Sequence, residues 1–362
     1  MDTAARRISM PVLIATWLCF SCLSVVCFNV EVRAQQPPAG AAAAVERERG
    51  IELYKQGDIK GAATALREAV KRGKDDAAAW YYLSLALSRD DDVKGARKAV
   101  EKAVQLRPDS ASMRASLAYL LAVSNKFGDA LREAERALAL NAQNAEANYV
   151  VSIVRFRQGE PAKALPAIQA ALKSKPDFPA ALLWKSQVLV SLYAERTDSP
   201  VKKESPEARK QRIWEQSALL KEATESLEKF FQLNPSPPDA AFWREQLATI
   251  RVYAQISQRD NPTAERTVYL SDELTTKAYI LSRPEPQYTD AARTNLVSGT
   301  VVLRAVFAVD GTVQHILVIR PLPDGLTEMA VKAARQIKFV PATINGRPVS
   351  QFIQIEYNFR IN

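Results

Sequence analysis

The residue types that usually carry chemistry are rare in this sequence. His315 is the only histidine among 362 residues, and the three cysteines, Cys19, Cys22 and Cys27, all lie in one N-terminal apolar stretch. A zinc site needs several cysteine or histidine ligands, so a lone histidine cannot build one. If the N-terminal stretch is removed, the remaining chain also has no cysteine nucleophile and no disulfide.

The other candidates for catalysis are isolated charges. Asp310-Gly311 indicates a turn rather than a metal site, and Arg304 and Glu356 lie in strand-like sequence, where single charges usually face solvent. We find no nucleophile paired with a base, no phosphate-binding loop and no pair of acids at catalytic spacing. We therefore expect no enzyme, no catalytic residue, no cofactor and no metal, and we interpret His315 as a surface strand residue.

The charge balance limits the classes of partner. The chain has 49 Lys and Arg against 40 Asp and Glu, a formal charge of +9, which favours anionic surfaces. Positive residues are mixed with acidic ones and no aromatic–basic RNA motif occurs, so we expect no nucleic-acid partner. Hydrophobic residues make up 47% of the chain. Its length of 362 residues is sufficient for two or three domains.

The N-terminus has the pattern of an export signal. Arg6-Arg7 precede an uncharged run from Val12 to Phe28, and Val32-x-Ala34 resembles a small-x-small cleavage site. We favour cleavage after Ala34. The alternative is a retained inner-membrane anchor, for which the run is at the short end of the roughly 20 residues that a spanning helix needs. Either way the rest of the chain is expected in the periplasm or cell envelope, and residues 35–42 are expected to form a flexible lead-in.

A period of 34 residues organises the chain from about residue 43. Two sets of alanines keep this spacing: Ala62, Ala96, Ala130 and Ala164, and Ala69, Ala103, Ala137 and Ala171. The pattern resembles the tetratricopeptide repeat (TPR), a helix–turn–helix unit of 34 residues. Small side chains are needed where two antiparallel helices cross, which explains the alanines. The units are 43–76, 77–110, 111–144 and 145–178.

A fifth unit is divided by an insertion. Its first helix is expected at 180–192, and its second resumes at Ala223, after a mixed-charge stretch at about 194–217 that we interpret as a solvated loop with a helical second half. Residues 240–258 predict a further helix that caps the array. The predicted solenoid therefore covers 43–258, and a linker covers 259–283.

Residues 284–362 have a different, strand-rich pattern. Apolar residues alternate from Val301 to Val309, the period of a half-buried strand, and Asp310-Gly311 is a strong hairpin signal before a second strand at 313–319. Helices are expected at 290–295 and 326–337, and a last strand at 351–359. This order predicts a small α+β domain with helices on one face of the sheet.

This segment resembles the C-terminal domain of TonB energy transducers. The resemblance rests on the following residues: Pro286-x-Tyr288, Ala291-Ala292-Arg293, Gly299-x-Val301-x-Leu303, Asp310-Gly311-x-Val313, Leu326-x-x-x-Ala330, Phe339-x-Pro341-Ala342 and Asn345-Gly346-x-Pro348-Val349. Thr289 departs from it, since the family usually has a proline there. The resemblance implies a periplasmic module that grips a short peptide of an outer-membrane transporter by adding it as a strand.

The repeat resemblance implies a concave groove lined by the first helix of each pair. Its exposed positions are the second, fifth, ninth and twelfth of the repeat, and two arginines lie one residue beyond the twelfth. These positions give Tyr81, Leu85, Arg89, Tyr119, Tyr149, Ile153, Phe156 and Arg157. An apolar groove of this kind suggests a peptide or protein ligand. The alternative is that these side chains pack between repeats or against the chain's own Pro-rich lead-in.

The last strand is the predicted docking edge of the TonB-like domain, because a terminal strand has one side without a following strand. The expected contact residues are Gln351, Ile353, Gln354, Ile355, Glu356 and Tyr357. Ile353, Ile355 and Tyr357 share one face of the strand, and Gln354 and Glu356 share the other.

Two functions remain open from the sequence. The first is a TonB-like partner of an outer-membrane transporter that also contacts inner-membrane motor proteins. The second is a periplasmic scaffold or adaptor that uses the same modules for binding without energy transduction. The run from Val12 to Phe28 holds no histidine, and the long Pro-rich spacer of the family is absent. Both features count against force transmission and leave binding unaffected.

Overall fold

The computed structural model describes residues 39–198, 205–258, 268–271 and 273–361. The expected export signal or anchor and its three cysteines lie outside these residues, as does the first part of the expected linker, 259–267. From Ala39 onward the chain forms one compact unit.

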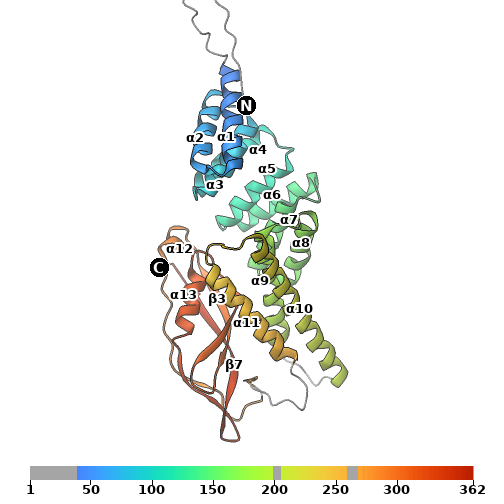
Figure 1. Ribbon diagram of the computed structural model, residues 1–362, viewed down its shortest axis with the longest axis vertical. Helices are drawn as coiled ribbons and strands as arrows, with labels where there is room; N and C mark the ends of the chain where they lie inside the picture. The colour runs from blue at the N-terminus through green and yellow to red at the C-terminus, as the bar shows by residue number, and fades with distance from the viewer. Residues whose placement is uncertain (1–38, 199–204, 259–267, 272, 362) are drawn as a thin grey trace, which may run out of the picture. The chain divides into compact units, whose positions relative to one another are not determined.

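The repeat region consists of helix–turn–helix pairs followed by one further helix (Figure 1). The helices are α1 (Ala39–Gln56), α2 (Ile59–Arg72), α3 (Ala77–Arg89), α4 (Val93–Leu106), α5 (Ala111–Val123), α6 (Phe127–Leu140), α7 (Ala145–Arg157), α8 (Pro161–Ser174), α9 (Pro179–Asp198), α10 (Pro206–Leu233) and α11 (Ala240–Gln258).

The turn inside each of the first four pairs depends on one left-handed residue. Residues with positive φ recur there at the period of 34: Gly57, Asp91, Asn125 and Gly159. Glycine adopts this conformation without strain, and Asp and Asn tolerate it better than other residues. Asp58 and Asp92, which follow the first two of these residues, accept hydrogen bonds from backbone amides of the next helix. The repeat therefore specifies its turns as well as its helix contacts.

The periodic alanines lie where the helices cross. Ala62, Ala96, Ala130, Ala164, Ala103, Ala137 and Ala171 are fully buried, and Ala69 is 1% exposed. Between them lie Leu66, Val100, Ala134 and Ile168, which are also fully buried. Small side chains at the crossing let the helix backbones approach closely, and Leu66, Val100 and Ile168 fill the remaining space.

The C-terminal domain is built on an antiparallel sheet. Its strands lie in the order β1 (Val268–Tyr269), β7 (Arg347–Phe359), β3 (Gly299–Phe307) and β4 (Val313–Arg320), and β6 (Ala342–Ile344) also pairs with β7. The β1–β7 pair is parallel. A separate pair joins β2 (Tyr279–Ser282) to β5 (Lys338–Val340).

The two faces of this sheet are both covered. On one face, Val301, Leu303 and Ile355 share a buried cluster with residues of α12 (Asp290–Thr294) and α13 (Leu326–Ala334). On the other face, Val302, Leu317 and Ile319 belong to a buried cluster with residues of α9, α10 and α11. The sheet is thus packed between its own helices and the last helices of the repeat region, a layered arrangement that buries apolar residues of both faces.

Several elements differ from the sequence predictions. Helix α1 begins at Ala39, inside the predicted lead-in, and α9 continues to Asp198, into the first half of the insertion, whereas α10 begins at Pro206 and agrees with the predicted helical second half. Strands β5 and β6 were not predicted, and β7 begins at Arg347 rather than at residue 351. Strands β1 and β2 lie within the predicted linker. Tyr269, Tyr279 and Ile280 in these strands are aromatic or β-branched residues, which suit a pleated surface. The short strands were missed because two to four residues give little periodicity.

The close crossing of the helices generates a testable prediction. Ala130→Leu should lower the free energy of unfolding by about 1–3 kcal/mol, because a larger side chain must be forced into a filled contact. Ala139→Leu on the same helix, α6, is the matched control, because Ala139 is exposed. Urea unfolding followed by circular dichroism measures both. Equal stability of the two variants would show that the alanines do not set the helix spacing.

Candidate functional site

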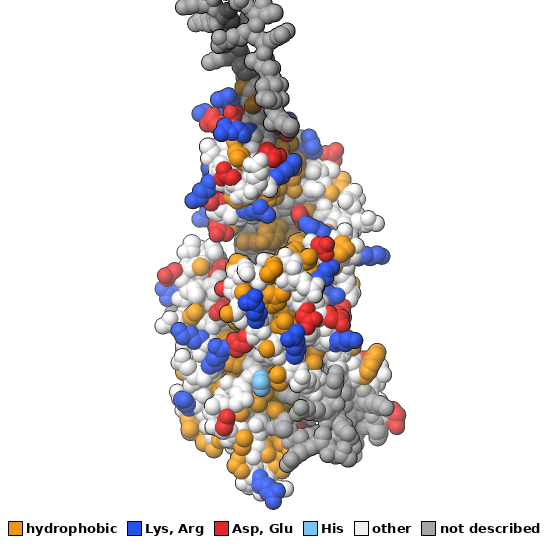
Figure 2. Space-filling view, viewed as in Figure 1, with side chains coloured by type: hydrophobic (Ala, Val, Ile, Leu, Met, Phe, Trp, Pro, Cys, Tyr) orange, Lys and Arg blue, Asp and Glu red, His pale blue; other side chains and the backbone are white. Residues whose placement is uncertain are grey.

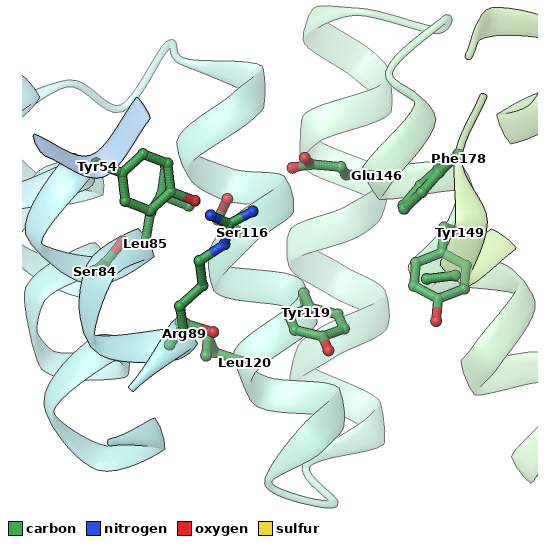
Figure 3. A pocket seen from close by; sticks show the side chains of 12 residues that line it. Tyr54, Ser84, Leu85, Arg89, Ser116, Tyr119, Leu120, Glu146, Tyr149 and Phe178 are labelled. Carbon is green, nitrogen blue, oxygen red and sulfur yellow. The ribbon is translucent and has the colours of Figure 1, made fainter. Parts of the chain in front are cut away.

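A pocket of about 220 Å³ lies in the repeat region, where the first helices of successive pairs face one another (Figure 3). Four of the eight residues predicted for the groove line it: Leu85, Arg89, Tyr119 and Tyr149. They come from α3, α5 and α7, so three successive repeats contribute to one site. Tyr54 from α1 and Phe178, which precedes α9, complete its two ends.

A row of aromatic rings forms one side of the pocket. The rings of Tyr119 and Tyr149 are stacked, with centroids 6.4 Å apart, and Phe178 meets Tyr149 edge-on at 5.1 Å. Burial raises the pKa of both tyrosine hydroxyls, so both stay neutral at physiological pH. The row offers apolar ring faces and neutral hydroxyl groups to a ligand.

Two charged side chains also line the pocket. The Arg89 guanidinium lies over the Tyr54 ring, 5.0 Å from its centroid, which is within the range of a cation–π contact. Glu146, in the first turn of α7, is half-buried. Burial raises the pKa of its carboxyl, and Lys175 partly opposes that effect. The pocket therefore combines apolar walls with one basic and one acidic group.

The other four predicted groove residues do not line this pocket. Tyr81 accepts a hydrogen bond from Ser116 at its hydroxyl, and Ile153 is half-buried outside the lining. Phe156 is 3% exposed and meets the Trp184 ring edge-on at 5.1 Å. Arg157 donates a hydrogen bond to the Pro321 carbonyl oxygen at 3.0 Å.

The prediction that Phe156 is an exposed groove residue is therefore wrong. The fifth unit packs against the end of α7, so Trp184 of α9 covers Phe156. Arg157 is held by the chain between β4 and α13. The repeat positions predict that these residues lie on the concave side, but they do not predict which later segment of the chain packs over them.

Four lining residues were missed although the same rule could have found them. Tyr54 and Ser88 occupy the twelfth positions of the repeats that begin at residues 43 and 77, and Glu146 and Ala180 occupy the second positions of those that begin at 145 and 179. Tyr54 lies in the first repeat, whereas the predicted set begins with the second. Glu146 is acidic, whereas the predicted set consists of aromatic, aliphatic and basic residues.

The predicted docking strand β7 is paired with β3 on one side from Gln351 to Phe359. Its partner β3 matches it from Gly299 opposite Phe359 to Phe307 opposite Gln351. The first residues of β7, 347–349, pair with β6, and Ser350 and Gln351 pair with β1 on the side away from β3. From Phe352 to Phe359 no described strand pairs with that side.

The side chains of β7 separate as the alternation predicts, with one correction. Ile355 and Tyr357 are buried, Ile353 is half-buried, and Gln354 and Glu356 are exposed. Gln351 is 2% exposed. Its side chain accepts from the Ala278 amide at 2.8 Å and donates to Ser271 at 3.0 Å. Gln351 was predicted as a docking residue, but β1 and these contacts occupy its surroundings.

One further side chain reaches the unpaired edge. The Arg283 guanidinium donates a hydrogen bond to the carbonyl oxygen of Glu356 and lies over the Tyr357 ring, 4.6 Å from its centroid. Since the neighbouring strand β3 lies on the opposite side, this bond shows that the Glu356 carbonyl points outward. Backbone groups that point outward alternate along a strand with those that bond the neighbour.

The opposite edge of the sheet, on β4, is closed by α11. The Gln246 side-chain amide donates to the Ile316 carbonyl at 3.1 Å, and its oxygen accepts from the Val318 amide at 3.0 Å. This is the pair of bonds that a residue of an adjacent parallel strand would make. Gln246 is 1% exposed, and the Tyr253 hydroxyl also donates to the His315 carbonyl at 3.1 Å.

The prediction for Arg304 is also wrong. It was predicted to face solvent, yet it is 6% exposed. Its guanidinium donates a hydrogen bond to Thr197 and lies over the Tyr193 ring, 5.9 Å from its centroid. Both partners belong to α9, so this arginine joins the sheet to the repeat region. Nothing in the local sequence indicates this, because the partners lie more than one hundred residues away.

The surface and the described side chains add two observations. On the face shown in Figure 2, Lys and Arg are interspersed with Asp and Glu, as the composition indicates. Among the residues that the structure describes, no group of three or more His, Cys, Asp or Glu side chains is arranged to hold a metal ion. Across the same residues, no helix combines the length and apolarity that a bilayer crossing requires.

Family comparisons agree with the two modules seen in the structure. The tetratricopeptide repeat model matches residues 47–111, 116–177 and 152–192. The family described as Gram-negative bacterial TonB protein C-terminal matches residues 284–361. The chain carries tetratricopeptide repeats and a TonB-type C-terminal domain. Both predicted resemblances and the predicted fold class are thereby confirmed.

These modules indicate a general role. TPR arrays mediate protein–protein interaction, and the TonB-type domain indicates a protein of the cell envelope. Both families are non-catalytic binding or scaffold domains. No functionally curated protein matches the sequence.

Several solved repeat proteins are similar to the chain. PilW, a widely conserved type IV pilus biogenesis factor, is 17% identical, with a TM-score of 0.44 over 62% of this chain and 96% of that one. PilF of Pseudomonas aeruginosa is 16% identical, with a TM-score of 0.43 over 63% and 96%. YrrB, a TPR protein with an unusual peptide-binding site, is 18% identical, with a TM-score of 0.36 over 56% and 90%.

The burial of Phe156 generates the second prediction. Phe156→Ala should lower the free energy of unfolding by about 3–5 kcal/mol, because it leaves a cavity beside Trp184. Tyr119→Ala is the matched aromatic truncation in the same array and should cost much less, since Tyr119 is 38% exposed. Urea unfolding of both variants measures the difference. If Phe156→Ala changed the free energy of unfolding only slightly, Phe156 would have to be an exposed groove residue after all.

The closure of the β4 edge generates the third prediction. Gln246→Leu leaves the Ile316 carbonyl and the Val318 amide without partners, at a cost of about 1–3 kcal/mol for each buried group. Gln246→Glu keeps an acceptor for Val318 but buries a carboxylate with one oxygen against the Ile316 carbonyl, so it should destabilise the protein at least as much as Gln246→Leu. Gln255→Leu, at an exposed position of α11, should be nearly neutral. Urea unfolding, together with amide exchange at Val318, tests this order, and equal exchange in all variants would contradict it.

Proposed function

We propose that this protein is a cell-envelope binding protein whose TonB-type domain docks a peptide of an outer-membrane transporter as an added strand on β7. The docking edge is Phe352–Phe359, and the TPR array holds a further protein partner. The observation that carries the proposal is the difference between the two sheet edges, since β4 is closed by Gln246 while this part of β7 has no described strand beside it.

The backbone of β7 supports strand addition. The outward Glu356 carbonyl places the backbone groups of Gln354 and Asn358 on the same outer side, because the direction alternates along the strand. The same alternation directs the amides of Ile355 and Tyr357 toward β3, with which they pair. A peptide laid along the edge would then use the amides and carbonyls of Gln354, Glu356 and Asn358.

The side chains at this edge could also make binding selective for the sequence of the peptide. Gln354 and Glu356 are exposed, and the Gln354 side chain donates a hydrogen bond to Glu356 at 2.9 Å. Because both side chains face solvent, they can contact side chains of the added strand. Arg283 must give up its bond to the Glu356 carbonyl when the peptide arrives. The same guanidinium can then turn to the peptide, because the Tyr357 ring beneath it provides a platform.

The outward and inward amides generate the fourth prediction. Gln354→Pro removes an outward N–H and should abolish capture of a transporter-derived peptide while the domain stays folded. Ile355→Pro removes an N–H directed at β3 and should destabilise the sheet itself. Thermal unfolding by circular dichroism and peptide binding by fluorescence anisotropy distinguish the two effects.

Amide exchange provides the direct control. On peptide binding, the outward amides of Gln354, Glu356 and Asn358 should gain protection, and those of Ile316 and Val318 on the closed β4 edge should not change. If the peptide binds and β7 gains no protection, the docking site lies elsewhere. If Gln354→Pro unfolds the domain and Ile355→Pro does not, the assignment of outward and inward groups is wrong.

A further inference from the structure

A second pocket is lined by residues of both the repeat region and the TonB-type domain. Its volume is about 220 Å³, which is below the roughly 300–1,000 Å³ of typical small-molecule sites, so it suits a group of only a few atoms. Four segments contribute to its lining: the turn at the start of α6, the end of α7, the start of β3, and the end of β4 with the residues that follow it. It shares no lining residue with the pocket of the tyrosine row.

Both charged residues of the second pocket are arginines. Arg157 is the last residue of α7, and Arg320 is the last residue of β4. No acidic residue is among the described residues that line this pocket. Asn125 and Ser298 also line it, and their side chains can donate hydrogen bonds. Two positive charges and several donors around one small volume favour a ligand that carries negative charge on several oxygens.

Arg157 is a half-buried cation whose hydrogen-bonding capacity is mostly unused. Its guanidinium has five N–H groups, and within the described part of the chain its one hydrogen bond goes to the Pro321 carbonyl oxygen at 3.0 Å. Burial lowers the pKa of this guanidinium, and Asp324 opposes that effect as a nearby charge. The Asp324 carboxylate forms no ion pair with Arg157 and instead accepts a hydrogen bond from Asn295 at 2.9 Å. A bound anion would lower the cost of burying this charge.

Arg320 supplies the second charge from the TonB-type domain. It is exposed, and among the residues that the structure describes its guanidinium has no hydrogen-bond acceptor and no ion-pair partner. It acts on Glu195 of α9 as a nearby charge that lowers the pKa of that carboxyl, against the effect of burial. Exposed side chains change rotamer within nanoseconds. Arg320 can therefore turn toward an anion in the pocket without breaking an existing contact.

The walls between these donors are apolar. Phe127, Phe156 and Leu322 line the pocket, and Phe156 and Leu322 are buried. Apolar surroundings exclude water and lower the local dielectric constant, which strengthens the attraction between a guanidinium and an anion. The second pocket thus has the features of a small anion site rather than of an open basic surface.

We propose that the second pocket binds a phosphate group, as inorganic phosphate or as a small phosphate monoester, through the guanidinium groups of Arg157 and Arg320. A phosphate directs its oxygens to the corners of a tetrahedron, so it can accept hydrogen bonds from donors on different segments. A carboxylate has two oxygens in one plane and would leave some of these donors without a partner. This inference does not depend on the proposed docking at β7.

The position of the two arginines adds a consequence for stability. Arg157 belongs to the repeat region and Arg320 to the TonB-type domain, so one bound phosphate would bond both modules. A ligand that binds the folded protein and not the unfolded chain raises the unfolding temperature in proportion to the logarithm of its concentration. Phosphate should therefore raise the unfolding temperature of the full-length chain.

The fifth prediction tests this with isothermal titration calorimetry of the full-length chain at neutral pH. Inorganic phosphate should bind saturably at one site, and sodium chloride at the same ionic strength should give no such binding. Acetate should bind at least about tenfold more weakly than phosphate, because it has fewer acceptor oxygens and a smaller charge. Glycerol phosphate distinguishes the two sources: tighter binding than inorganic phosphate supports an ester, and weaker binding supports the free ion.

Three variants assign the site. Arg157→Gln and Arg320→Gln should each weaken phosphate binding at least about tenfold, because each removes charge-assisted hydrogen bonds. Arg155→Gln is the matched control, since it removes the same charge from the same helix but lies outside the pocket lining and pairs with Glu160. It should bind phosphate as the unchanged protein does. Arg320 is exposed, so Arg320→Gln provides a folded variant even if Arg157→Gln loses its helical circular dichroism signal.

Three results would overturn this inference. The first is phosphate binding no stronger than the effect of sodium chloride at equal ionic strength. The second is equal phosphate affinity of Arg320→Gln and Arg155→Gln, which would show that only overall charge matters. The third is acetate binding as tight as phosphate binding. Peptide docking on β7, measured with the same protein, is unaffected by any of these results, so the two proposals can fail separately.

Discussion

The contact between α11 and β4 is the constraint on which the use of the C-terminal sheet depends. A buried side-chain amide supplies the two bonds that a neighbouring strand would supply, so this edge cannot accept a peptide or a second copy of the domain. The α9 contacts to Arg304 join the same sheet to the last helices of the repeat region.

The periodic parts of the fold could be predicted from the sequence because their causes are local. The alanines at the crossings, the turn residues such as Gly57 and Gly159, and the Asp310-Gly311 hairpin each act within one or two neighbouring elements. The strand of the TonB-type domain from Val301 to Val309 could also be predicted from the sequence, since its alternation of apolar residues identifies both the strand and its buried face. Four of the eight predicted groove residues line the pocket for the same reason.

The failures share a different cause, which is contact between segments distant in the sequence. Phe156 was predicted to be exposed, but Trp184 packs on it. Arg304 was predicted to face solvent, but it contacts Thr197 and Tyr193 of α9. Gln351 was predicted to contact the docked peptide, but β1 pairs with it. Each residue has the type and position that its local pattern expects. A period can tell which face of a helix or strand a residue occupies, but it cannot tell which later segment packs on that face.

The hydrogen bond from Arg283 to the Glu356 carbonyl has a consequence for the protein in a crowded envelope. An unpaired strand edge invites edge-to-edge pairing with other copies, which leads to aggregation. A charged side chain laid over that edge places a positive group where a second β7 would approach, and two such edges would bring two guanidinium groups together. The residue that a docking peptide must displace therefore also keeps the empty edge from pairing with itself.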